Sequence, residues 1–151
     1  MAEGEFALVK EHLEVNSHKP ALKLGLLVTD NVLHFMLADL AVLQRDEAAL
    51  QQYAPLAAET AARDGHVLFQ ASAQRALGVL GRLAGDYVEA EEYLQQALQV
   101  FRELETRWQI GRTLFELAEL AAARTDFDQA RDYCSQALVS FEEMEASPDV
   151  A

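Results

Sequence analysis

The chain has few of the residues that build covalent, metal-bound or catalytic sites. Cys134 is the single cysteine among 151 residues, so no internal disulfide can form. The four histidines do not have the spacing of a zinc site, and no cysteine pair accompanies them. The sequence also lacks a phosphate-binding glycine loop and a nucleophile-elbow serine. These absences predict a non-enzymatic protein with no metal and no cofactor.

Basic residues and long apolar runs are scarce as well. Twelve lysines and arginines face 25 acidic residues, which gives a net charge of −13. This charge disfavours nucleic acid and anionic membrane surfaces as partners. No apolar run approaches the roughly 20 residues of a membrane-spanning helix, and the acidic start Met1-Ala2-Glu3 does not resemble a secretory signal. We therefore expect a cytoplasmic protein that binds neither nucleic acid nor membrane.

What the chain does contain is an internal repeat of forty residues. The same residue recurs at this spacing in five sets: Tyr53, Tyr93 and Tyr133; Leu37, Leu77 and Leu117; Leu40, Leu80 and Leu120; Asp46, Asp86 and Asp126; Ala57, Ala97 and Ala137. A period of this size indicates stacked units, each of which buries its apolar face on the next. Apolar residues inside each unit have helical spacing and never alternate as in a strand. The repeat therefore predicts an all-α fold.

The two clearest copies share a pattern of small and aromatic positions. One copy runs Leu77-Gly78, Gly85-Asp86-Tyr87, Ala90, Leu94, Ala97, and the next runs Leu117-Ala118, Thr125-Asp126-Phe127, Ala130, Cys134, Ala137. This pattern resembles the tetratricopeptide repeat (TPR), in its long form of about forty residues per repeat, as in bacterial signalling proteins and the sensor arrays of transcription activators. The resemblance implies a right-handed α-α superhelix of stacked antiparallel helix hairpins. It implies no specific ligand, because the repeat is a scaffold.

The repeat also suggests how the chain is divided. We expect five segments: an incomplete unit or cap helix at 1–25, a degenerate repeat at 26–65, repeats at 66–105 and 106–145, and a frayed tail at 146–151. The first repeat is degenerate because Arg45-Asp46-Glu47 lacks the aromatic residue of the other copies. Helix pairs are expected over 26–64, 66–104 and 106–145, after a shorter helix near 5–15.

A candidate ligand groove follows from the resemblance. In this family the first helix of each unit lines a concave groove, and the matching positions here include Phe35, Asp39, Ser72, Arg75, Val79, Arg82, Arg112, Phe115 and Glu119. Arginines beside aromatic residues suit an acidic peptide or partner domain with apolar anchors. On this interpretation we expect Arg75, Arg82 and Arg112 to be exposed on the concave side. The other interpretation is that these arginines pair with Asp39 and Glu119 as internal salt links.

Two further expectations concern context and assembly. The chain is either a protein-interaction module or a regulatory or spacer part of a larger bacterial signalling or transcription-regulatory protein. We also expect a homodimer through an end of the stack, because the last unit has apolar positions with no following unit to cover them. Candidates for that surface are Leu114, Leu117, Tyr133, Leu138 and Phe141. Cys134 occupies the position of Leu94, and we expect it to be a small buried hydrophobe.

Overall fold

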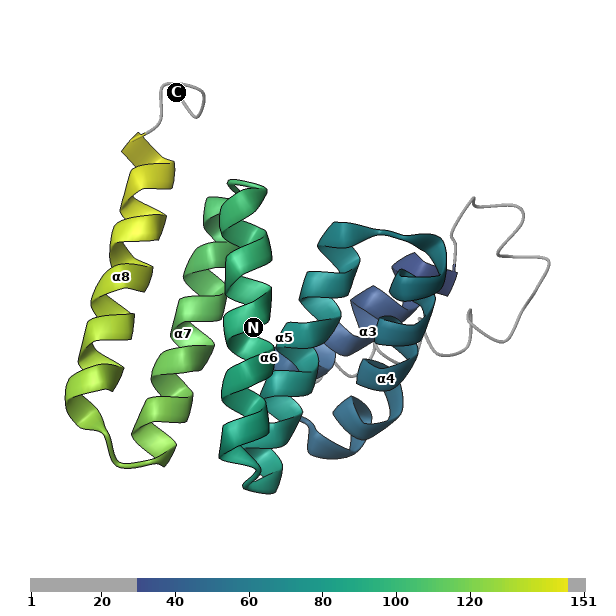
Figure 1. Cartoon of the computed structure of the whole chain (residues 1–151), viewed down its shortest axis with the longest axis horizontal. Helices are drawn as coiled ribbons and strands as arrows, with labels where there is room; N and C mark the ends of the chain where they lie inside the picture. The colour runs from purple at the N-terminus through teal and green to yellow at the C-terminus, as the bar shows by residue number, and fades with distance from the viewer. Residues whose placement is uncertain (1–29, 147–151) are drawn as a thin grey trace. The chain divides into compact units, whose positions relative to one another are not determined.

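A computed structural model describes residues 30–146 of the chain, and these residues form six α-helices joined by short turns (Figure 1). The helices are α3 (Asp30–Gln44), α4 (Glu47–Asp64), α5 (Val67–Ala84), α6 (Tyr87–Glu103), α7 (Arg107–Ala123) and α8 (Phe127–Ala146). No strand occurs within this range, so the expected all-α fold of helix hairpins is confirmed. The helix expected near 5–15, the unit expected at 1–25 and the end of the expected tail lie outside the described residues.

The turns show why each helix ends where it does. The Asp46 carboxylate accepts a hydrogen bond from the backbone N–H of Ala49 at 3.1 Å and caps the start of α4. The Asp126 carboxylate makes the same bond to the N–H of Gln129 in α8. One residue before each of these caps, the backbone enters the left-handed region, with φ of +52° at Arg45 and +62° at Thr125. The turns at these two positions of the forty-residue repeat therefore have the same geometry: a residue at positive φ followed by a capping aspartate.

Thr125 is the most strained of these turn residues, because a β-branched side chain is unfavourable at positive φ. Its counterpart Gly85 adopts φ of +87° without that cost. We expect Thr125→Gly to raise the free energy of unfolding by about 0.5–1 kcal/mol, which is the relieved strain less the added entropy of the unfolded chain. Urea denaturation checks this, with Thr125→Ala as the control that keeps the Cβ. A loss of stability in Thr125→Gly would contradict the strain argument.

The chain divides within α5 into two compact units, one ending at Ala76 and the other beginning at Leu77. In unit 1, α3 and α4 pack against each other through buried residues such as Leu37, Leu50 and Tyr53. The ring of Phe35 on α3 stacks on Phe69 at the start of α5, with ring centroids 4.7 Å apart. Unit 1 is thus a helix hairpin with the first half of α5 packed on it.

In unit 2, α7 lies between α6 and α8 and contacts both (Figure 1). Its core is a cluster of small and branched apolar residues: Ala90, Leu94, Leu98, Leu114, Leu117, Leu120 and Ala137. Gly78 allows α5 to approach α6 closely, because a Cβ there would lie 2.7 Å from Cγ of Leu94. The small residues at these crossings explain the alanine and glycine content of the repeat.

Candidate interaction surfaces

The exposed side of α7 carries three of the residues expected in the groove. Arg112, Phe115 and Glu119 are spaced three and four apart, so they lie on one helix face. The opposite face of α7 is buried through Leu114, Leu117 and neighbouring small residues. Phe115 is 42% exposed, and Arg112 and Glu119 are partly exposed. α7 therefore presents a cation, an aromatic ring and a carboxylate along about two turns of helix.

Arg82 in unit 2 pairs with acidic side chains of α7. Its guanidinium lies 3.5 Å from the Glu116 carboxylate and 3.6 Å from the Glu119 carboxylate, and its side chain is mostly buried. This geometry bears out the second interpretation of the arginines, in which Arg82 forms an internal salt link with Glu119. Arg82 connects α5 to α7 and presents little surface to a ligand.

Arg75 in unit 1 is fully buried, so the expectation that it is exposed is wrong. Its guanidinium donates to the Asp39 carboxylate on α3 at 3.3 Å. A buried guanidinium needs such a carboxylate, because desolvating it without a partner is costly. Ser72 and Val79 are buried too, whereas Phe35 and Asp39 are partly exposed. The residues expected in the groove thus separate into a buried group and a partly exposed group.

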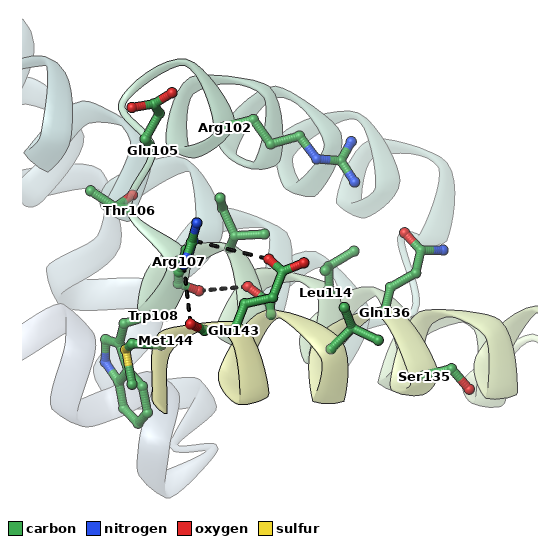
Figure 2. A pocket seen from close by; sticks show the side chains of 13 residues that line it. Arg102, Glu105, Thr106, Arg107, Trp108, Leu114, Ser135, Gln136, Glu143 and Met144 are labelled. Carbon is green, nitrogen blue, oxygen red and sulfur yellow. Dashed lines mark hydrogen bonds and ion pairs between the residues drawn. The ribbon is translucent and has the colours of Figure 1, made fainter. Parts of the chain in front are cut away.

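A crevice of about 890 Å³ opens in unit 2, on a side that the sequence interpretation did not select (Figure 2). It lies beside α8, near the C-terminal end of α6 and the start of α7. Its lining combines apolar and polar residues: Ile110, Leu114, Val139, Met144 and Trp108, with Arg102, Glu105, Thr106, Arg107, Ser135, Gln136, Ser140 and Glu143. Such a surface suits an apolar side chain flanked by polar groups.

Hydrogen bonds connect α8 to the start of α7 beside the crevice, and to α6 further along the helix. Arg107 donates to the backbone carbonyl of Glu143 at 3.1 Å, and the Ser140 hydroxyl donates to the Arg107 carbonyl at 2.9 Å (Figure 2). Further along the same helices, Gln95 of α6 donates to the Tyr133 hydroxyl of α8 at 3.0 Å. The crevice is therefore bounded by contacts that fix α8 relative to α6 and α7.

The sequence contains only a faint signal of this crevice. Ser135 and Ser140 are smaller than Gln95 and Val100, which stand forty residues earlier. A crevice between helices distant in sequence nevertheless depends on their separation, which the repeat pattern does not specify.

The outer face of α8 corrects two expectations about the end of the stack. Cys134 is exposed, although its counterpart Leu94 is fully buried. Leu94 belongs to the core cluster with α7, whereas α8 has no described helix on the corresponding face. Among the candidate end residues, Leu138 is 58% exposed, but Leu114 and Leu117 point into the core. Tyr133 and Phe141 are half-buried, and the Phe141 ring lies 5.3 Å from that of Trp108.

The described part of the chain offers little that suits a metal ion or a membrane. Between residues 30 and 146, no group of three or more histidine, cysteine or acidic side chains is arranged to hold a metal ion. None of the helices α3 to α8 combines the length and apolar character needed to cross a bilayer. The surfaces that stand out are those suited to another protein: the α7 face, the crevice and the outer side of α8.

Comparison with known proteins agrees with this geometry. Residues 69–143, which include most of α5 and α8 and all of α6 and α7, match the model of the tetratricopeptide repeat. Comparisons with curated proteins and with solved structures found no match. The tetratricopeptide repeat is a non-catalytic helix hairpin that mediates protein–protein interaction. The chain belongs to the tetratricopeptide repeat family.

Proposed function

We propose that this chain is a non-catalytic, cytoplasmic interaction module that binds a peptide or partner domain through the exposed face of α7. The observation that carries the proposal is the order Arg112, Phe115, Glu119 on that face, with Phe115 exposed between the two charges. Exposed aromatic residues flanked by arginine are common anchors in protein interfaces. In unit 1, the partly exposed Phe35 and Asp39 are the corresponding groove residues.

The ligand that fits this face has apolar and acidic residues close together. An apolar side chain of the ligand packs on Phe115, and an acidic side chain pairs with the planar guanidinium of Arg112. The buried Arg75 and Arg82 have a supporting role, because Asp39, Glu116 and Glu119 already pair with them. Neither nucleic acid nor a membrane is part of this proposal, in agreement with the net charge of −13.

The second candidate is a regulatory or spacer segment within a larger bacterial signalling or transcription-regulatory protein. The exposure of Cys134 and Leu138 on α8 favours it, because a following repeat would cover those side chains. The gene context distinguishes the two candidates: a longer reading frame with an attached effector domain supports the spacer, and a short frame supports the module.

Selection from a displayed peptide library, with the purified chain as bait, tests the interaction proposal. We expect enrichment of peptides with acidic and aromatic or aliphatic residues. Phe115→Ala and Arg112→Glu should each lower the affinity for the selected peptide by at least about tenfold, as expected for residues at the centre of an interface. Binding should also weaken with added salt. Arg63→Glu makes the same charge change on a different helix, α4, and should leave the affinity unchanged.

The crevice provides the competing location for the ligand. Val139→Arg places a long charged side chain on the crevice wall and does not touch the α7 face. If Val139→Arg abolishes peptide binding while Arg112→Glu and Phe115→Ala do not, the ligand binds in the crevice and the α7 proposal is wrong.

A further inference from the structure

One face of α8 remains exposed although half of its residues are apolar. We call it the α8 end face, and it consists of Phe127, Arg131, Cys134, Leu138, Glu142 and Glu145. The spacings of three and four residues place all six on one side of the helix. Phe127 and Leu138 are both more than half exposed, and Cys134 is exposed between them.

The preceding repeat shows how side chains at two of these positions pack when a helix covers them. Forty residues earlier, Leu94 and Leu98 occupy the places of Cys134 and Leu138 on α6. Both leucines are buried in the core cluster with Leu114 of α7. In the preceding repeat, therefore, the side chains at these two positions pack against a neighbouring helix. The α8 end face has the same layout and is suited to a helix partner.

We propose that this partner is the α8 end face of a second copy of the chain, packed antiparallel about a two-fold axis at Leu138. Arg131 lies seven residues before Leu138, and Glu145 lies seven residues after it. Antiparallel packing about Leu138 thus places each Arg131 opposite Glu145 of the other copy. The two Leu138 side chains meet at the axis. The interface is self-complementary, as a two-fold dimer requires.

The charges also exclude the parallel arrangement. Parallel helices in register would place Arg131 against Arg131 and would bring Glu142 and Glu145 against their own copies. Like charges in direct opposition are destabilising. Within the monomer, Arg131 lies 3.3 Å from Asp128, but both side chains are highly exposed, and such a pair contributes little. Arg131 therefore loses little when it turns toward Glu145 of a second copy.

The size of the face predicts a weak dimer. α8 has 20 residues, which corresponds to a length of about 30 Å. A single helix pair of this length buries less than the roughly 800 Å² per partner of a standard interface. We expect a dissociation constant on the order of micromolar or weaker. This inference does not depend on the ligand proposed for α7, because the α8 end face and Arg112–Glu119 are separate surfaces.

Cysteine crosslinking tests the position of the axis. In a Cys134→Ser background, Leu138→Cys should form an intermolecular disulfide within minutes of mild oxidation, because two residues on the axis of a close helix pair come within disulfide range. Wild-type Cys134 should crosslink poorly. Its Cα would lie about 12 Å along the helix from its symmetry mate, beyond the reach of a disulfide. Gln129→Cys, in the same Cys134→Ser background, lies on the opposite side of α8 and is the matched control.

A charge exchange tests the partner and the direction of packing. Arg131→Glu should raise the dissociation constant at least about tenfold, and the double variant Arg131→Glu/Glu145→Arg should restore it. Sedimentation equilibrium of the full chain measures this, with circular dichroism confirming that each variant is folded. A mass that stays at 16.7 kDa up to several hundred micromolar overturns the proposal. Faster crosslinking through Cys134 or Gln129→Cys than through Leu138→Cys overturns the two-fold axis at Leu138.

Discussion

Leu98→Ala should lower the free energy of unfolding by about 3 kcal/mol, whereas Leu138→Ala should lower it by less than about 0.5 kcal/mol. The two leucines occupy the same position in successive repeats. Leu98 is only 2% exposed and belongs to the core cluster of unit 2, so its removal leaves a cavity. Leu138 is 58% exposed and leaves none. Both substitutions remove the same atoms, so the difference in stability arises from the surroundings of each leucine.

Urea denaturation at low micromolar concentration measures both effects while the chain is monomeric. Trp108 is the single tryptophan, and it lies in unit 2 against Phe141. Its fluorescence therefore reports the unit that contains both leucines. Equal losses in the two variants would mean that α8 is covered in the monomer, and they would remove the basis of the dimer proposal. At several hundred micromolar the Leu138→Ala variant should instead dissociate more readily than the wild type.

Asp39→Ala should lower the free energy of unfolding by about 2–3 kcal/mol, because it removes an acceptor from the buried guanidinium of Arg75. Arg75→Met should cost less, within about 1 kcal/mol of the wild type. Methionine fills a similar volume without a charge, and Asp39 is partly exposed and can be hydrated after Arg75 is removed. Removal of Asp39 should therefore destabilise the fold more than removal of Arg75.

Circular dichroism during urea denaturation provides the measurement, and the double variant Asp39→Ala/Arg75→Met completes the cycle. The double variant should recover most of the stability lost in Asp39→Ala, because it no longer contains the buried charge. A double variant as unstable as Asp39→Ala would show that the loss arises from packing around Asp39. The same variants should retain peptide binding on α7 if the arginines of α5 only support the groove.

The candidate groove was partly predictable from the sequence. The spacing of Arg112, Phe115 and Glu119 places them on one face of α7, and that face is partly exposed. The same reasoning applied to Ser72, Arg75 and Val79 gave the correct helix but the wrong environment, because all three are buried. Helical spacing tells which residues share a face. It does not tell how deeply that face is covered.

The class of fold and the positions of its turns were predictable from the sequence alone. The recurrence of Tyr53, Tyr93 and Tyr133 predicted stacked helix hairpins, and the recurrence of Asp46, Asp86 and Asp126 marked where the second helix of each hairpin begins. These features depend on local chemistry: apolar periodicity, capping and turn conformation act within a few residues. They therefore remain visible without any knowledge of distant contacts.

Which repeated positions are exposed, in contrast, depends on how the helices pack. Leu94 and Cys134 share one place in the repeat, yet one is fully buried and the other is exposed. Arg75 and Phe115 also correspond, and there the charged residue is the buried one, because Asp39 on α3 pairs with it. The crevice beside Val139 is likewise lined by residues of α6, α7 and α8 that only the packing of these helices brings together. Burial depends on the neighbour that covers a side chain, and a repeat pattern contains no information about that neighbour.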